Sequence, residues 1–131
     1  MIDLDKLADV VREAGYAATV EDGHLLFKVE GTSYWLETFE NDDTYMRLRV
    51  SYLMPSGISV EALLNAANEQ NRKTKVVKTV VYPLPEDDRI AFSIELFFGD
   101  STIWNSIFER ALAALRVTSD EYYLSLAEVA R

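Results

Sequence analysis

The sequence contains no cysteine and only one histidine, His24. Without cysteine there can be no disulfide framework, no thiolate nucleophile and no zinc site built on thiolates. A single histidine also excludes a metal site that has two histidine ligands. We therefore expect neither a metal nor a cofactor, and we interpret His24, at the start of a predicted strand, as an ordinary surface residue.

Basic residues and long apolar runs are also scarce. The chain has 13 lysines and arginines against 22 acidic residues, which gives a formal net charge of −9 at pH 7. Binding to nucleic acid normally uses a basic surface, and the same holds for anionic membranes, so neither partner is expected. No apolar run approaches the roughly 20 residues needed to cross a bilayer. Residues 1–11 are acidic rather than basic on balance and do not resemble a signal peptide. We therefore expect a cytoplasmic protein.

Motifs typical of enzymes are missing as well. The chain has no G-x-S-x-G nucleophile elbow, no G-x-G-x-x-G and no G-x-x-x-x-G-K-[ST]. Two acidic clusters, Asp42-Asp43 and Glu86-Asp87-Asp88, lack the ligand spacing and internal glycine of a calcium loop. We interpret both as solvated loops, and we predict that the protein is not an enzyme.

The hydrophobic pattern predicts an α+β fold within one domain that spans residues 1–131. Short connections between neighbouring extended runs indicate antiparallel pairing. We expect a five-stranded antiparallel sheet with helices mainly on one face, in the order α-β-β-β-α-β-β-α followed by a C-terminal helical segment. The expected helices are 3–14, 60–72 and 101–116, with a shorter segment at 119–130, and the expected strands are 24–30, 33–39, 44–53, 75–82 and 89–98.

Residues suited to helix ends support these boundaries. Asp3 and Ser59 are candidate N-caps, since their side chains can accept hydrogen bonds from free backbone N–H groups. Gly15 follows the first helix, where glycine commonly ends a helix. Asp100 or Ser101 would cap the third helix.

Aromatic and basic side chains alternate with apolar ones along the three central strands. This alternation places Trp35, Tyr45, Arg47 and Arg49 on one face of the sheet. Aromatic residues and arginine are enriched at protein interfaces. Two interpretations remain open: the face binds a partner protein, or a second copy of the chain or the C-terminal segment covers it.

Three asparagines, Asn65, Asn68 and Asn71, stand in the helix predicted at 60–72. Asparagine is a poor helix former because its side chain competes for backbone hydrogen bonds. At 100° per residue, Asn71 falls within the apolar stripe and Asn68 on its flank, while Asn65 points away. Since a buried amide needs partners, we predict that Asn71, helped by Asn68, ties the helix to the following strand. Ligand binding by these amides is the alternative.

The same region carries a resemblance to a known family. The segment 63–82, LLNAANEQNRKTKVVKTVVY, followed by RIAFSIELFF at 89–98, resembles the YbjN-like bacterial family. Members of that family show a helix that ends in an A-N-x-x-N element, then a lysine-bearing strand and an apolar strand. Here the element is Ala67-Asn68-Glu69-Gln70-Asn71, and Lys75 and Lys78 follow it.

Residues 21–36, EDGHLLFKVEGTSYWL, are also similar to the family, so the likeness covers roughly residues 3–116. The resemblance implies a fold like that of type III secretion chaperones, which are small, acidic, cytosolic and commonly dimeric, and which hold an extended partner segment. YbjN-like proteins are described as sensory-transduction regulators without an established enzymatic activity. The resemblance therefore supplies no catalytic residues.

Together these observations predict a non-catalytic protein-binding module, regulatory or chaperone-like, with a protein partner and a homodimeric state. The alternative is a small-ligand-binding or enzymatic protein that uses a pocket between sheet and helices. A purely structural oligomer subunit is a third interpretation. A convergent pocket holding His24 or several buried carboxylates would favour the ligand-binding alternative, and a broad aromatic groove would favour the protein-binding module.

Overall fold

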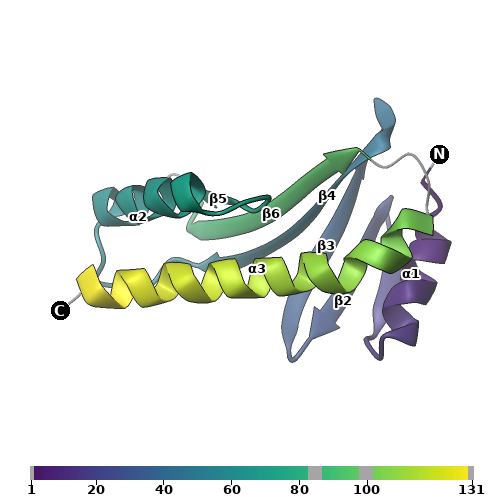
Figure 1. The fold of residues 1–131 in the computed structure, drawn as a ribbon, viewed down its shortest axis with the longest axis horizontal. Helices are drawn as coiled ribbons and strands as arrows, with labels where there is room; N and C mark the ends of the chain where they lie inside the picture. Colours follow the sequence, from purple (N-terminus) through teal and green to yellow (C-terminus); the bar gives the residue numbers. More distant parts are fainter. Residues whose placement is uncertain (1, 83–86, 98–101, 130–131) are drawn as a thin grey trace.

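The computed structural model describes residues 2–82, 87–97 and 102–129. The elements follow one another as helices at the two ends and in the middle, with strands between them (Figure 1). In chain order they are α1 (Leu4–Glu13), β1 (Ala18–Glu21), β2 (His24–Val29), β3 (Thr32–Phe39), β4 (Asp42–Leu53), α2 (Val60–Lys73), β5 (Lys78–Val81), β6 (Arg89–Phe97) and α3 (Thr102–Val129).

The strands form one antiparallel sheet in the order β1-β2-β3-β4-β6-β5. Helix α1 packs against β1 and β2, while α3 runs along the sheet and contacts β6 and both other helices. Helix α2 contacts both α3 and the edge strand β5. We call the sheet face that points away from α3 the outer face. No described helix lies on it, which confirms an α+β architecture with one face covered.

The core lies between the sheet and the helices. Along β4, Met46, Leu48 and Val50 are fully buried, and the residues between them lie partly exposed on the outer face. This is the period of two that an extended strand imposes. From the helical side, Trp104 and Phe108 of α3 fill the same core. The hydrophobic alternation read from the sequence therefore identified the buried face correctly.

The sheet has six strands, not the five that the sequence predicted. The additional strand, β1, pairs with β2 through a two-residue turn at Asp22-Gly23. Both turn residues have positive φ angles, 48° and 78°, the backbone of a type I′ hairpin turn that Asp-Gly favours. No strand was expected before residue 24, so this hairpin was not predicted. β1 was missed because it has only four residues.

The helix predicted at 101–116 and the terminal segment at 119–130 are one continuous helix, α3. A break was expected near Thr118 and Ser119, which are weak helix formers. Both side chains are buried, and the Ser119 hydroxyl donates to the Arg116 carbonyl oxygen at 3.0 Å. Packing therefore outweighs local propensity here. Within the described ranges, no helix has both the length and the apolar composition of a membrane span.

The helix ends agree with the sequence analysis where they can be compared. The Asp3 carboxylate accepts from the backbone N–H groups of two residues in the first turn of α1, and the Ser59 hydroxyl accepts from Ala62 N at the start of α2. Gly15 follows α1 with a φ of 98°. The proposed caps Asp100 and Ser101 lie outside the described residues.

A buried tyrosine hydroxyl joins α3 to α2. Tyr122 is fully buried, and its hydroxyl donates to the carbonyl oxygen of Leu63 at 2.9 Å. Burial raises the pKa of Tyr122 to about 12, so the phenol stays a hydrogen-bond donor at physiological pH. The neighbouring Tyr123 differs, because its buried hydroxyl has no hydrogen-bond partner among the described residues.

This contrast predicts opposite results for two matched substitutions. Tyr122→Phe removes the bond to Leu63 and should lower the free energy of unfolding by about 1 kcal/mol. Tyr123→Phe removes a hydroxyl that has no partner to lose, so the free energy of unfolding should stay equal or rise. Urea titration followed by circular dichroism measures both, and equal losses in the two variants would contradict the assigned bond.

Candidate functional site

The four residues predicted to form a partner surface lie together on the outer face. The register places Trp35 of β3 opposite Arg49 of β4, and Arg47 two residues away on the same strand. Tyr45 follows at the next outward position of β4, and all four side chains are partly exposed. We call Trp35, Tyr45, Arg47 and Arg49 the outer-face residues.

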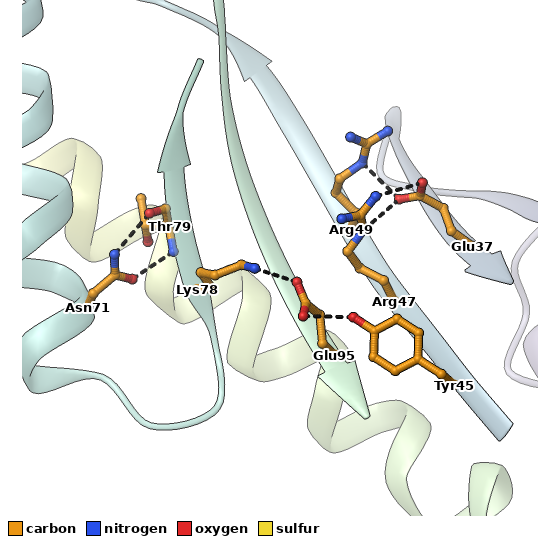
Figure 2. A network of polar contacts seen from close by, with 8 residues as sticks. All are labelled: Glu37, Tyr45, Arg47, Arg49, Asn71, Lys78, Thr79 and Glu95. Carbon is orange, nitrogen blue, oxygen red and sulfur yellow. Dashed lines mark hydrogen bonds and ion pairs between the residues drawn. The ribbon is translucent and has the colours of Figure 1, made fainter. Parts of the chain in front are cut away.

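One carboxylate holds both arginines of this set. The Nε and Nη2 atoms of Arg47 bind the two oxygens of Glu37 at 3.2 and 3.1 Å, and Arg49 Nε binds Glu37 Oε1 at 3.1 Å (Figure 2). The hydrogen bonds that Arg47 donates to Glu37 raise the pKa of Arg47 above its ordinary value. The paired, two-pronged geometry fixes the direction of the guanidinium group. Two cations on one anion leave this cluster with excess positive charge.

A second carboxylate, Glu95 of β6, joins the neighbouring strands. The Tyr45 hydroxyl donates to Glu95 Oε2 at 2.7 Å, and Lys78 Nζ of β5 pairs with the other oxygen (Figure 2). The hydrogen bonds from Lys78 and then Tyr45 lower the pKa of Glu95, while the bond to Glu95 raises the pKa of Tyr45. The sequence analysis did not foresee this cluster, since it depends on the pairing of β6 with both β4 and β5.

Aromatic rings continue the outer face toward one end of the sheet. The ring centroids of Phe39 and Tyr45 lie 5.2 Å apart, and those of Tyr45 and Phe97 lie 5.8 Å apart. The guanidinium carbon of Arg47 lies 5.5 Å from the centroid of Phe39, within the range of a cation–π contact. We call Phe39, Tyr45 and Phe97 the aromatic row. Phe97 is 77% exposed and was missed, although alternation from Glu95 could have placed it here.

The two contacts of Glu95 predict a pH-dependent contribution to stability. Because the pKa of Glu95 in the folded protein lies below its ordinary value of 4.5, the contribution is present above that pH and is lost as the pH falls through the lowered pKa. The cluster is partly exposed, so Glu95→Gln should lower the free energy of unfolding by only about 0.5 kcal/mol at pH 7. Denaturant unfolding at a series of pH values should show this difference vanish in acid. Glu109→Gln, at an exposed position of α3, is the control, and a difference that persists in acid would contradict the charge pairing.

Asn71 makes two hydrogen bonds to the edge strand β5. Its Nδ2 donates to the Thr79 carbonyl oxygen at 3.0 Å, and its Oδ1 accepts from Thr79 N at 2.7 Å (Figure 2). An amide presents a donor and an acceptor side by side, as a neighbouring backbone would. Asn71 therefore occupies the position of a further strand at Thr79. That this contact stabilises the fold is a proposal, tested below.

The surroundings of the asparagines differ from the expectation. Asn71 is an exposed residue and does not lie at the centre of the buried stripe of α2. The stripe is formed by Leu63, Ala67 and Gln70, and the Gln70 amide donates to Thr74 Oγ1 at 2.8 Å and to a Glu121 oxygen at 3.0 Å. Asn68 is exposed and has no side-chain hydrogen bond to any described residue, so it does not assist Asn71.

Substitution of the two asparagines should separate their roles. Asn71→Ala removes both bonds to Thr79, and we expect a loss of about 1–2 kcal/mol in the free energy of unfolding. Asn68→Ala removes no contact and replaces a weak helix former, so stability should be unchanged or a few tenths of a kcal/mol higher. Thermal melting of the two variants beside the wild type provides the comparison. Equal melting temperatures would show that the Asn71 amide serves binding rather than stability.

The two acidic clusters were interpreted as solvated loops, but Asp42 and Asp43 are the first residues of β4, whereas Asp87 and Asp88 lie in a loop. Asp42 Oδ1 accepts from the backbone N and the hydroxyl of Thr44 at 3.0 and 2.6 Å, and these bonds lower the pKa of Asp42. Asp87 accepts from the backbone N of Asp88, and Glu86 lies outside the described residues. Among the residues with described positions, no group of three or more His, Asp and Glu side chains is arranged to hold a metal ion.

His24 lines a hollow of about 550 Å³ between the start of α1 and the turns that flank β2 and β3. Its Nδ1 atom is buried and has no hydrogen-bond partner in the described part of the chain. Three carboxylates, Asp22, Glu40 and Asp43, share the hollow, but all three are exposed residues. Of the two signs named for ligand binding, a pocket that holds His24 is therefore present, and buried carboxylates are absent from the residues that line it.

No protein-family model and no curated protein sequence matches the chain. Solved structures do. YbjN of E. coli, a proposed transcription regulator, superposes with a TM-score of 0.70 at 11% identity, over 89% of this chain and 88% of that one. An uncharacterised protein of Methanothermobacter thermautotrophicus superposes with a TM-score of 0.72 at 10% identity, over 99% and 100% of the two chains.

A chain of the HopA1–SchA chaperone–effector complex is also similar, with a TM-score of 0.65 at 11% identity over 93% of this chain and 98% of that one. The chain has the YbjN-like, type III secretion chaperone-like fold. The resemblance read from the sequence is thus confirmed for the YbjN-like fold. Identities of 10–11% extend no further than the fold, so the function must be argued from the surface of this chain.

Proposed function

We propose that the protein is a non-catalytic, cytoplasmic protein-binding module, regulatory or chaperone-like, that binds its partner through the outer face. The observation that carries this proposal is the arrangement of the outer-face residues: arginine and aromatic side chains lie exposed on a sheet face that no described helix covers. Tryptophan, tyrosine and arginine are the side chains that most often dominate binding energy at interfaces.

The outer face is also organised before any partner arrives. Glu37 holds Arg47 and Arg49, and Phe39 lies under the Arg47 guanidinium. Side chains that are already fixed lose less conformational freedom on binding, so more of the contact energy remains as affinity. The positive charge on this face stands out in a chain with a net charge of −9, which favours a partner segment with acidic residues.

The fold neighbours support a protein partner in general terms. One of them is part of a chaperone–effector complex, and another is a proposed transcription regulator. We also propose a homodimer. Two apolar side chains on the solvent side of α3, Val117 and Leu124, are 55% and 69% exposed and are available for such an interface.

A small-ligand function is the second candidate, and the hollow beside His24 favours it. A ligand site usually combines a largely enclosed apolar cavity with a few converging polar groups. Here the carboxylates are exposed, and His24, which lines the hollow, has a buried Nδ1 atom without a hydrogen-bond partner among the described residues. The outer face, with its fixed arginines and aromatic row, is the better supported site.

Truncation of the outer face tests the proposal. A Trp35→Ala/Arg47→Ala variant should stay folded, because both side chains are partly exposed, but it should lose partner capture, since truncating one interface anchor can cost about 2 kcal/mol or more. Quantitative affinity capture from the native host, with wild type and variant in parallel, measures the loss. Leu64→Ala/Arg72→Ala, on the exposed side of α2, is the matched control. Equal recovery of the same partners by all three proteins would show that the outer face does not bind them.

A further inference from the structure

Strand β6 is longer than its edge neighbour β5. The pairing of β5 with β6 begins at Lys78 opposite Ser93, whereas β6 continues to Phe97 and stays paired with β4 as far as Tyr45. Figure 2 shows the arrow of β6 running on past the start of β5. Among the described parts of the chain, residues 94–97 therefore have a partner strand on one side only.

The backbone groups of Glu95 point toward this open side. Asn71 binds the N–H and C=O of Thr79 from outside the sheet, so these two groups point away from β6. Neighbouring residues of a strand direct their backbone groups to opposite sides, and Lys78 therefore exchanges hydrogen bonds with its partner Ser93. The backbone N–H and C=O groups of residues two apart on a strand point to the same neighbouring strand. The N–H and C=O of Glu95 are thus directed to the position that β5 would occupy if it were longer.

A strained turn diverts the chain away from that position. Val77 N donates to the Lys75 carbonyl oxygen at 2.8 Å, and Val76 between them has a φ of 75°. This is the rare classic form of the γ-turn, and a positive φ is a genuine outlier for a β-branched residue. Such strain persists where surrounding structure maintains it, often at binding sites. The Val76 side chain is 72% exposed.

Beside the open edge lies a groove of about 340 Å³ between β6, α3 and this turn. Its lining is mostly apolar and also includes two cations, Lys75 from the turn and Arg110 from α3, and Glu95. Neither cation forms an ion pair with a residue that the structure describes. The Glu95 carboxylate does not neutralise them, because Lys78 and Tyr45 hold it on the outer face. The apolar lining consists of Val76, Ile94, Leu96, Ile107, Ala111 and Ala114.

We propose that this groove binds an extended peptide segment that adds to the open edge of β6 as a short strand. The peptide backbone bonds to Glu95, an apolar side chain enters the groove, and an acidic side chain lies between Lys75 and Arg110. Strand addition to a sheet edge is a recognised mode of peptide binding, in which alternate side chains fill pockets. The inference rests on the proposed function only in taking a protein partner, and its site is separate from the outer-face residues.

A synthetic peptide tests the site directly. The probe is a fluorescein-labelled heptapeptide of alternating valine and glutamate, titrated with the full-length protein and followed by fluorescence anisotropy. We expect saturable binding, and no binding of the matched valine–lysine peptide. Arg110→Glu should weaken binding by about tenfold or more, as reversal of a contacting charge does. Lys73→Glu makes an equal charge change at an exposed position of α2 outside the groove. Its affinity for the peptide should stay within about twofold of the wild-type value.

Two further measurements separate strand addition from binding through charge or apolar contact alone. A peptide N-methylated at alternate amides should bind far more weakly, because it cannot complete the ladder with Glu95. Val76→Gly should raise or maintain the melting temperature, since glycine adopts a positive φ freely, yet weaken peptide binding through the lost apolar contact.

The proposal is overturned if the valine–glutamate peptide does not bind, or if its N-methylated form binds equally well. It is also overturned if the protein self-associates and Arg110→Glu abolishes that association, because the groove would then hold a second copy of the chain. Trp35→Ala/Arg47→Ala should bind the peptide normally. Loss of partner capture in that variant with peptide binding intact agrees with both proposals. Unchanged capture overturns the outer-face proposal alone, and a wild type that captures its partner but does not bind the peptide overturns the groove proposal alone.

Discussion

The helices that the structure describes lie on one face of this six-stranded sheet, and the chemistry of the other face follows from that asymmetry. A sheet face left in water must carry polar side chains, but a face that also binds a partner needs aromatic and cationic groups held in place. Glu37 and Glu95 reconcile these needs by fixing two arginines, a tyrosine and a lysine between neighbouring strands. Partly exposed ion pairs add little to stability, so their main effect is to orient the side chains around them.

The two edge strands of the sheet are covered in the same way. Each edge strand, β1 and β5, has four residues, and each is closed by a side chain from the helix that precedes it in the chain. Arg12 of α1 donates to the Ala18 carbonyl oxygen at 2.9 Å, and Asn71 of α2 satisfies both backbone groups of Thr79. Unpaired edges invite unwanted strand pairing, and short, covered edges prevent it. The part of β6 beyond β5 lacks such a cover among the described residues, which makes it the exposed edge available to a partner.

Hydrophobic periodicity was sufficient to predict the architecture, because burial on one face imposes alternation on strands and a stripe on helices. It failed where tertiary contacts determine which residues are buried and which side chains meet. The helical wheel of α2 placed Asn71 within the apolar stripe, yet Asn71 is exposed and the buried stripe turns toward Gln70 instead. Likewise, alternation placed the outer-face residues on one face, but the convergence of Arg47 and Arg49 on Glu37 depends on strand register, which turn lengths set. β1 was too short to give a periodic signal.

Strand β6 connects the two proposed binding surfaces. Its outward residues, Glu95 and Phe97, belong to the Glu95 cluster and the aromatic row, while Ile94 and Leu96 line the groove on the opposite side. The backbone of Glu95 borders the open edge between them. An extended partner segment that pairs with this edge therefore presents alternate side chains to both surfaces, since successive side chains of a strand point to opposite faces. Solved structures with 10–11% identity share the fold with this chain, so the choice of partner must come from these particular side chains. The charge distribution agrees, because cations on both sides of β6, Lys78 and Arg110, would attract the same acidic segment.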